Sequence, residues 1–169
     1  MTDRTHTRAL VVGAGGLGCP VLIGLAEAGI GSIRLVDDDR VELSNLQRQV
    51  LYGASDVGRL KVEVAQERLR ERFPDLKLEL EVARFDESNA VRLLEGVDVA
   101  IDATDDPAAR FILNDHALRL SIPAVLGGVI RFEGLVMGVH PAGGACFRCL
   151  FEGPPEAGEV MTCAAAGVL

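Results

Sequence analysis

The residues best suited to chemistry lie in a polar segment that runs from Asp37 to Gln49. It begins with three consecutive aspartates, and Asn45 and Arg48 follow near its end. Lys61 comes thirteen residues after Arg48 and is one of only two lysines among 17 basic residues. Two cations beside a carboxylate cluster suit a triphosphate with Mg²⁺, because the cations neutralise phosphate charge and carboxylates can hold the metal.

A second acidic cluster covers residues 102–106, and Arg110 follows one helical turn into the next predicted helix. Each of these residues also has a structural interpretation: Arg48 and Lys61 as surface ion-pair partners, and Asp105 as a helix N-cap. For any one of these residues taken alone, the sequence supports a structural role and a functional role about equally. The whole set, placed at matched strand ends, favours a binding site instead.

Residues 13–18 read Gly-Ala-Gly-Gly-Leu-Gly and match the G-x-G-x-x-G pattern between a predicted strand and a predicted helix. Such a loop lets the backbone approach phosphate, and the helix N-terminus supplies N–H donors. Asp37 lies 19 residues after Gly18, where an acid can bind ribose hydroxyls. On these residues alone, an NAD(P)-dependent oxidoreductase remains open, although the three histidines stand in no catalytic arrangement.

Alternating strands and helices must position these residues. The pattern predicts an α/β fold with a Rossmann-like, doubly wound, mainly parallel sheet, helices on both faces, and antiparallel strands added near the C-terminus. We expect one domain over residues 1–169, with a long loop at 141–158. The predicted strands cover residues 8–12, 32–36, 76–83, 97–101, 124–126 and 135–139. The predicted helices cover residues 17–28, 61–73, 87–94 and 107–120.

Composition narrows the class of protein. A net charge of −8, with the acidic residues dispersed, argues against general nucleic-acid binding, which needs a basic surface. No apolar stretch is long enough to span a membrane, and the first residues do not read as a signal peptide. We therefore expect a cytoplasmic protein without a membrane partner.

The six residues from Ser44 to Gln49, Ser-Asn-Leu-Gln-Arg-Gln, are the most specific motif. Together with the glycine loop, Lys61 and the Asp-x-Thr-Asp sequence at 102–105, they resemble the MoeB/ThiF/HesA family, bacterial relatives of ubiquitin-activating enzymes. The resemblance implies a homodimer that adenylates the C-terminal glycine of a ubiquitin-like sulfur carrier in molybdopterin, thiamin or cysteine sulfur chemistry. ATP and Mg²⁺ are the implied cofactors.

By this resemblance Arg48, Lys61 and Asp105 are catalytic, and Asp105 binds Mg²⁺. Three alternatives remain: the NAD(P) oxidoreductase, a truncated non-catalytic member that binds nucleotide or carrier, and an enzyme that activates a small-molecule or tRNA-borne carboxylate. The candidate cofactor-binding residues are Gly13, Gly15, Gly16, Gly18, Asp37, Asp39, Ser44, Asn45, Arg48, Gln49, Lys61, Asp105 and Asp106.

Three of the four cysteines lie between residues 140 and 169. Cys146 and Cys149 form a C-x-x-C pair, which is half of a tetrahedral zinc site. Family members complete that site with a second pair, which is absent here, so we expect little or no zinc and the core of a longer or diverged enzyme. The resemblance places Cys163 where some members form a thioester or acyl disulfide. Cys19 is predicted to be a buried thiol.

Overall fold

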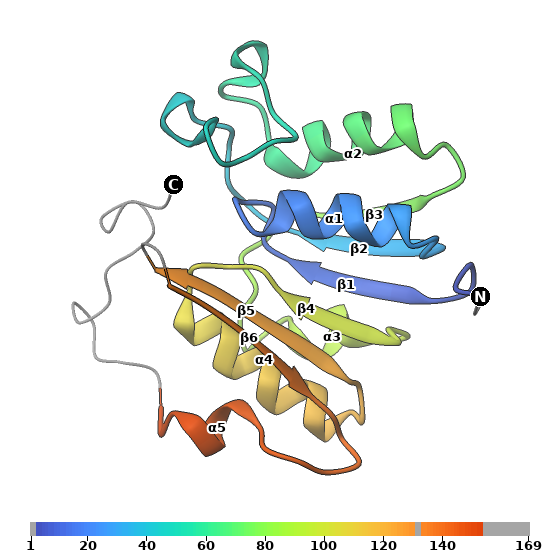
Figure 1. Cartoon of the computed structure of the whole chain (residues 1–169). Coiled ribbons are helices and arrows are strands. Elements are labelled where there is room, and N and C mark those ends of the chain that lie inside the picture. The colour runs from blue at the N-terminus through green and yellow to red at the C-terminus, as the bar shows by residue number, and fades with distance from the viewer. Residues whose placement is uncertain (1–2, 131–132, 154–169) are drawn as a thin grey trace.

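Figure 1 shows the computed structural model, which describes residues 3–130 and 133–153. Its centre is a six-stranded sheet in the order β3-β2-β1-β4-β5-β6, in which only β6 runs antiparallel to its neighbour. The chain builds outward from β1 to β3 and then crosses back to β4, so the order reverses between β1 and β4. Ligands of doubly wound sheets bind at that point. The strands are β1 (Arg8–Val12), β2 (Ser32–Val36), β3 (Lys77–Glu81), β4 (Val99–Asp102), β5 (Ala124–Ile130) and β6 (Glu133–Val139).

Helices cover both faces of the sheet (Figure 1). On one face, Ala9 and Val11 of β1 join the core that contains residues of α1 and α2. On the other, Leu10 and Val12 join the core that contains residues of α3 and α4. A strand buried on both sides reads as a continuous apolar run, which is why β1 is so clear in the sequence. The helices are α1 (Gly18–Glu27), α2 (Lys61–Arg72), α3 (Ala90–Leu94), α4 (Pro107–Arg119) and α5 (Phe147–Leu150).

The predicted fold class is confirmed, including the antiparallel strand pair near the C-terminus. Two details differ. Strand β5 continues through Gly127 and Gly128 because it pairs with all of β6, whereas glycine lowers strand propensity and hides this extension in the sequence. A short helix, α5, lies inside the loop expected at 141–158, because long-range contacts of Phe147 hold it.

Within the described residues, no helix is long and apolar enough to cross a membrane. The expected single domain over residues 1–169 stays a prediction.

Candidate functional site

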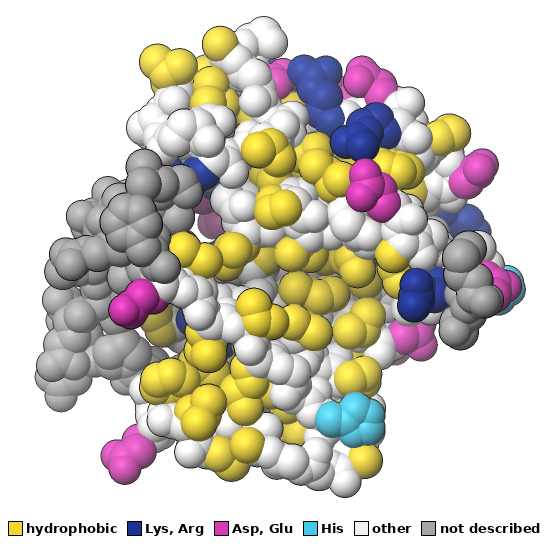
Figure 2. Space-filling view, in the orientation of Figure 1, with side chains coloured by type: hydrophobic (Ala, Val, Ile, Leu, Met, Phe, Trp, Pro, Cys, Tyr) yellow, Lys and Arg dark blue, Asp and Glu magenta, His cyan; other side chains and the backbone are white. Residues whose placement is uncertain are grey.

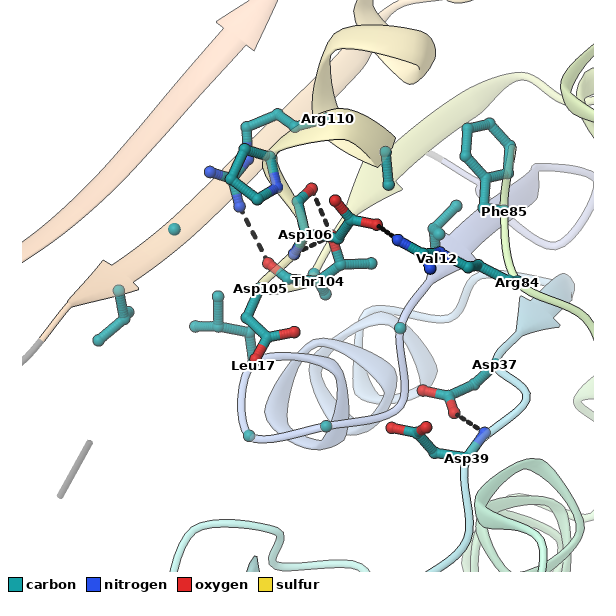
Figure 3. A pocket seen from close by; sticks show the side chains of 18 of the residues that line it. Val12, Leu17, Asp37, Asp39, Arg84, Phe85, Thr104, Asp105, Asp106 and Arg110 are labelled. Atoms are coloured by element: carbon teal, nitrogen blue, oxygen red, sulfur yellow. Dashed lines mark hydrogen bonds and ion pairs between the residues drawn. The ribbon is translucent and has the colours of Figure 1, made fainter. Parts of the chain in front are cut away.

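A cleft of about 1320 Å³ opens at the carboxyl edge of the sheet, where the strand order reverses. It is lined by the segments that follow β1, β2, β3 and β4, and by Phe147 of α5. All the candidate cofactor-binding residues except Gly18 line it. Figure 3 shows Asp37 and Asp39 at one end of the glycine loop and Asp105 beside Leu17 at the other.

Two glycines of the loop are required by close backbone packing. Gly13 has a φ of +96°, and a Cβ there would lie 2.9 Å from the carbonyl oxygen of Ala103. A Cβ on Gly18 would overlap the carbonyl oxygen of Gly13. Gly18 therefore lets α1 start directly against the loop, although it does not itself face the cleft.

The other two glycines lie beside the polar segment. A Cβ on Gly16 would lie 3.3 Å from the side chain of Arg48, and one on Gly15 would lie 3.7 Å from Nε2 of Gln49. The nearby Asn45 accepts a 2.7 Å hydrogen bond from the Arg48 guanidinium through its Oδ1. Arg48 is thus held against the loop, as a phosphate-binding cation would need to be.

Asp37 joins the end of β2 to the glycine loop. Its carboxylate accepts hydrogen bonds from the backbone N–H of Ala14 (2.7 Å) and of Asp39 (2.8 Å). Burial raises the pKa of Asp37, and nearby Lys61 opposes that shift. Lys61 is only 4% exposed, and its Nζ lies 2.6 Å from Oδ2 of the exposed Asp39. We call residues 13–18 with Asp37, Asp38, Asp39 and Lys61 the glycine-loop wall.

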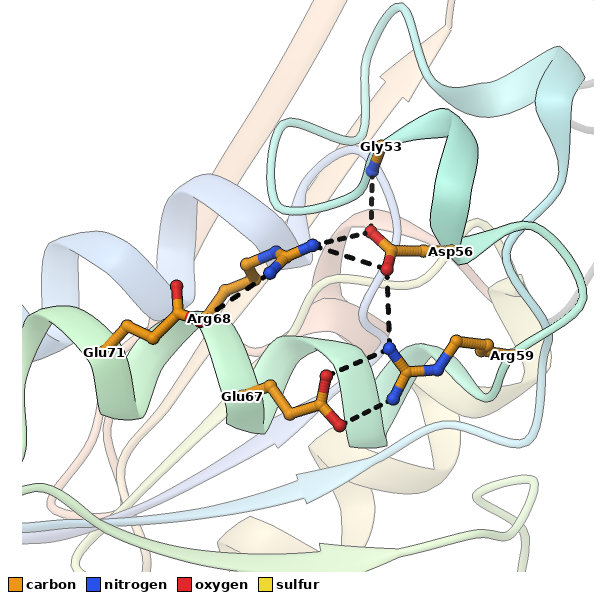
Figure 4. A network of polar contacts seen from close by, with 6 residues as sticks. All are labelled: Gly53, Asp56, Arg59, Glu67, Arg68 and Glu71. Carbon is orange, nitrogen blue, oxygen red and sulfur yellow. Dashed lines mark hydrogen bonds and ion pairs between the residues drawn. The ribbon is translucent and has the colours of Figure 1, made fainter.

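A polar network attaches the chain after the Ser-Asn-Leu-Gln-Arg-Gln motif to α2 (Figure 4). One 3₁₀ turn, Leu43–Asn45, lies at the start of the motif, and a second, Ala54–Asp56, follows it. Buried Asp56 accepts hydrogen bonds from the Gly53 N–H (2.9 Å) and from Arg68 (3.1 Å). The Gly53 amide is the main cause that lowers the pKa of Asp56, and Arg68 adds to it. The sequence analysis missed Asp56, although its three-residue spacing from Gly53 is that of a capping box.

The opposite side of the cleft is built on a buried ion pair. Asp102 is 1% exposed, and its carboxylate accepts a 2.6 Å hydrogen bond from Arg110 and a 2.7 Å bond from the Thr104 hydroxyl. Burial raises the pKa of Asp102, and the Arg110 charge opposes it. Arg110 also donates to the carbonyl oxygen of Thr104 (2.9 Å). Residues 102–106 with Arg110 form what we call the Asp105 wall.

The helix cap is Asp106, so the alternative that Asp105 is the N-cap is wrong. Oδ1 of Asp106 accepts a 2.9 Å hydrogen bond from the N–H of Ala108, and Oδ2 pairs with Arg84 at 2.6 Å. These contacts commit the Asp106 carboxylate to structure, although it lines the cleft. Asp105 is exposed and has no ion-pair or hydrogen-bond partner among the described residues, which leaves it available to a ligand.

Asp37, Asp38 and Asp39 form the only group of at least three potential metal-ligating side chains found among residues 3–130 and 133–153. Their carboxylate oxygens lie within 4.8 Å of one another. The sequence analysis noted the three aspartates but assigned Mg²⁺ to Asp105. Oxygen ligands of this kind suit Mg²⁺, so the glycine-loop wall offers a second set of ligands.

The C-x-x-C pair lies at the start of α5, with the two sulfur atoms 3.6 Å apart. Two thiolates on one zinc ion lie about 3.8 Å apart in tetrahedral geometry, so the spacing fits half a site. In the described part of the chain, no third ligand joins Cys146 and Cys149 in such a group. Cys19 is fully buried, as expected, and Cys163 lies outside the described residues.

Comparison with known proteins places this site in a family. A profile of the ThiF family matches residues 2–169. The chain is 45% identical to the sulfur carrier protein adenylyltransferase of Thermus thermophilus, over 94% of this chain and 60% of that protein. It is 46% identical to the SAMP-activating enzyme E1 of Haloferax volcanii, over 96% of this chain and 60% of that protein.

Solved structures agree in fold. E. coli MccB, crystallised with AMPCPP and MccA, superposes with a TM-score of 0.80 at 26% identity, covering 88% of this chain and 45% of that one. MccB with ATP gives a TM-score of 0.77 at 27% identity, over 86% of this chain and 45% of that one. The chain spans 60% of the length of both curated relatives named above. The family match and the geometry of the cleft lead to one conclusion: the chain belongs to the ThiF family.

Proposed function

We propose that this chain adenylates the C-terminal glycine carboxylate of a ubiquitin-like sulfur carrier, with ATP and Mg²⁺, and releases pyrophosphate. The observation that carries the proposal is the placement of Arg48 beside the glycine loop and of Lys61 in the same cleft. Asp105, which has no ion-pair or hydrogen-bond partner among the described residues, lies on the other side. The names of the curated relatives, which include adenylyltransferases of sulfur carriers, support the choice of substrate.

In the proposed reaction, a carboxylate oxygen of the carrier attacks the α-phosphorus of ATP. The bond from that phosphorus to the oxygen bridging to the β-phosphate breaks, and the electron pair leaves with pyrophosphate. Two anions must meet, so the protein has to supply positive charge and positioning rather than a nucleophile. Arg48 and Lys61 provide the charge, and the backbone amides of residues 15–17 supply fixed hydrogen-bond donors.

Mg²⁺ would neutralise phosphate charge and orient the leaving pyrophosphate when it is bound. Asp105 is the proposed ligand, because its carboxylate is exposed, unpaired among the described residues, and lines the cleft. The three aspartates of the glycine-loop wall are the alternative ligands. The variants Asp105→Asn and Asp39→Asn distinguish these two possible sites. Only the loss of a true ligand should raise the Mg²⁺ concentration needed for half-maximal activity.

The chain offers a matched pair of lysines for testing adenylation. Lys61→Ala should abolish carrier-dependent exchange of labelled pyrophosphate into ATP, because the cation beside the cleft is lost. Lys77, the only other lysine, is exposed on β3 and does not line the cleft, so Lys77→Ala should leave exchange unchanged. Pyrophosphate exchange at the wild-type rate in Lys61→Ala would overturn the proposal. So would a wild-type chain that binds the carrier but catalyses no pyrophosphate exchange.

Nucleotide choice separates adenylation from the oxidoreductase alternative. ATP with Mg²⁺ should raise the melting temperature of the wild-type chain, and NAD should not. Stabilisation by NAD alone would favour the oxidoreductase. We also propose that the reaction takes place in the cytoplasm.

We also propose that two copies associate through the uncovered face of β5 and β6. Figure 1 shows α4 behind these strands and no described helix in front of them. Val125 is 36% exposed and Val136 80% exposed on this face, where Figure 2 shows hydrophobic side chains gathered. Light scattering should give the mass of a dimer, and Val136→Asp should shift it toward that of a monomer.

The roles of the cysteines remain proposals. Cys146 and Cys149 would hold zinc weakly by themselves, so the metal content of the purified chain should be well below one zinc per chain. A covalent role for Cys163 predicts that Cys163→Ala prevents a thioester with the activated carrier while pyrophosphate exchange continues.

A further inference from the structure

Tyr52 lies beneath the glycine loop and contacts it directly. The residue is 7% exposed, and its hydroxyl donates a 2.7 Å hydrogen bond to the carbonyl oxygen of Ala14. The buried thiol of Cys19 lies 3.6 Å from the same oxygen. Burial raises the pKa of Tyr52 far above its usual value, so the hydroxyl remains a donor at any pH at which the protein works.

These contacts fix the orientation of two successive peptide groups in the loop, Gly13–Ala14 and Ala14–Gly15. The N–H of Ala14 is held by Asp37, and its carbonyl group is held by Tyr52. A trans peptide is planar, with its C=O and the following N–H pointing in opposite directions. Holding the Ala14 carbonyl toward the core therefore turns the N–H of Gly15 toward the cleft, which Gly15 lines. Among the described residues, no group accepts a hydrogen bond from that N–H.

Tyr52 also belongs to the segment that carries the cationic side of the site. Its own N–H donates to the carbonyl oxygen of Gln49 at 3.1 Å. Gln49 and Arg48 lie next to Gly15 and Gly16 on the cleft side of the loop. The segment 48–52 thus wraps the glycine loop, with Arg48 above it and the Tyr52 hydroxyl below.

We propose that Tyr52 is a positioning residue whose hydroxyl aims the Gly15 amide at a phosphate of the bound nucleotide. This role rests on the proposed function, because it assigns the phosphate to ATP. The Tyr52 ring itself touches no substrate. It acts through the Ala14–Gly15 peptide, whose rotation would turn the donor away from the cleft.

Tyr52→Phe tests this role, because it removes the hydroxyl and keeps the buried ring. Ser88→Ala is the matched control: its hydroxyl makes a 2.6 Å hydrogen bond to Asp86 and does not line the cleft. Both variants are compared with the wild-type chain by thermal unfolding, by the NMR HN–Hα coupling constants of Gly15 without nucleotide, which report its φ angle, and by titration with ATP and Mg²⁺.

We expect an effect in Tyr52→Phe alone. The HN–Hα coupling constants of Gly15 should differ from those of the wild-type chain, because the Ala14–Gly15 peptide can rotate once its carbonyl group loses the Tyr52 hydroxyl. The dissociation constant for ATP should rise about fivefold to tenfold, the factor expected for the loss of one neutral hydrogen bond. Ser88→Ala should change neither quantity. A Tyr52→Phe variant that folds with the wild-type Gly15 coupling constants would overturn the inference. If the wild-type chain bound no ATP, the proposed function would fail, whereas the coupling constants would still decide the positioning role.

Discussion

The two walls of the cleft are stabilised by different physical means. The Asp105 wall rests on a buried ion pair between Asp102 and Arg110, whose side chains are 1% and 12% exposed. The glycine-loop wall rests on hydrogen bonds to backbone groups, from Tyr52 to Ala14 and from Ala14 to Asp37. The stability of the Asp105 wall thus depends on a pair of opposite charges that is shielded from water. That of the glycine-loop wall depends mainly on hydrogen bonds that fix the orientation of peptide groups.

The walls also differ in the charges that they leave for a ligand. On the Asp105 wall, Asp102 and Asp106 have dedicated arginine partners, so Asp105 is the only unpaired carboxylate among residues 102–106. On the glycine-loop wall, three neighbouring carboxylates share one lysine, Lys61, which forms an ion pair with Asp39. The Asp105 wall therefore presents a single carboxylate to a ligand. The glycine-loop wall presents an excess of negative charge, which a bound metal cation would neutralise.

The largest effect on stability should come from breaking the buried ion pair. Asp102→Ala leaves the Arg110 guanidinium buried without its partner, which costs about 3–5 kcal/mol of unfolding free energy. Urea unfolding measures this change. Asp38→Ala removes an exposed carboxylate from the other wall and should stay within about 0.5 kcal/mol of wild type. Equal losses in the two variants would contradict the contrast between the walls.

The largest effect on activity at unchanged stability should come from Asp105. Asp105→Asn removes a charge that has no partner in the described chain, so the melting temperature should not change. Pyrophosphate exchange should fall by about 100-fold or more, the usual cost of losing one electrostatic contact to the reacting groups. Pyrophosphate exchange near the wild-type level in Asp105→Asn would instead indicate that the catalytic carboxylate lies on the glycine-loop wall.

A smaller effect should separate Asp106 from its neighbour. Asp106→Ala removes the N-cap of α4 and should lower the unfolding free energy by about 1 kcal/mol. Asparagine caps helices as well as aspartate does, so Asp106→Asn should keep pyrophosphate exchange within twofold of wild type. A large loss of exchange in Asp106→Asn would instead restore the sequence-based prediction that Asp106 binds the cofactor.

The mildest test is alkaline titration of the glycine-loop wall. Tyr52 is the only tyrosine, and the chain has no tryptophan, so phenolate absorbance reports on this residue alone. Its folded pKa is raised, so its contribution to stability is fully present below the unfolded pKa of about 10 and is lost above it. Stability should fall by about 1.4 kcal/mol per pH unit there, and phenolate should appear only with unfolding. Phenolate in the folded chain at pH 10–11 would contradict this burial.

The sequence by itself determined the fold class, most element boundaries and the set of residues around the cleft. The reason is local: apolar periodicity sets strands and helices, and in a parallel sheet the segments after neighbouring strands meet at one edge. Strand β2 occupies the predicted residues 32–36, and the polar segment after it lines the cleft. The family resemblance, drawn from the same motifs, is confirmed.

Only the tertiary structure decided what each polar residue does within that set. Asp105 and Asp106 are adjacent and chemically identical. Asp106 caps α4 and pairs with Arg84, whereas Asp105 has no partner in the described part of the chain. Tyr52 and Asp56 lacked any periodic signal, because their partners Ala14 and Arg68 are 38 and 12 residues away. Such roles depend on distances between distant parts of the chain, which exist only after the sheet and its helices have packed.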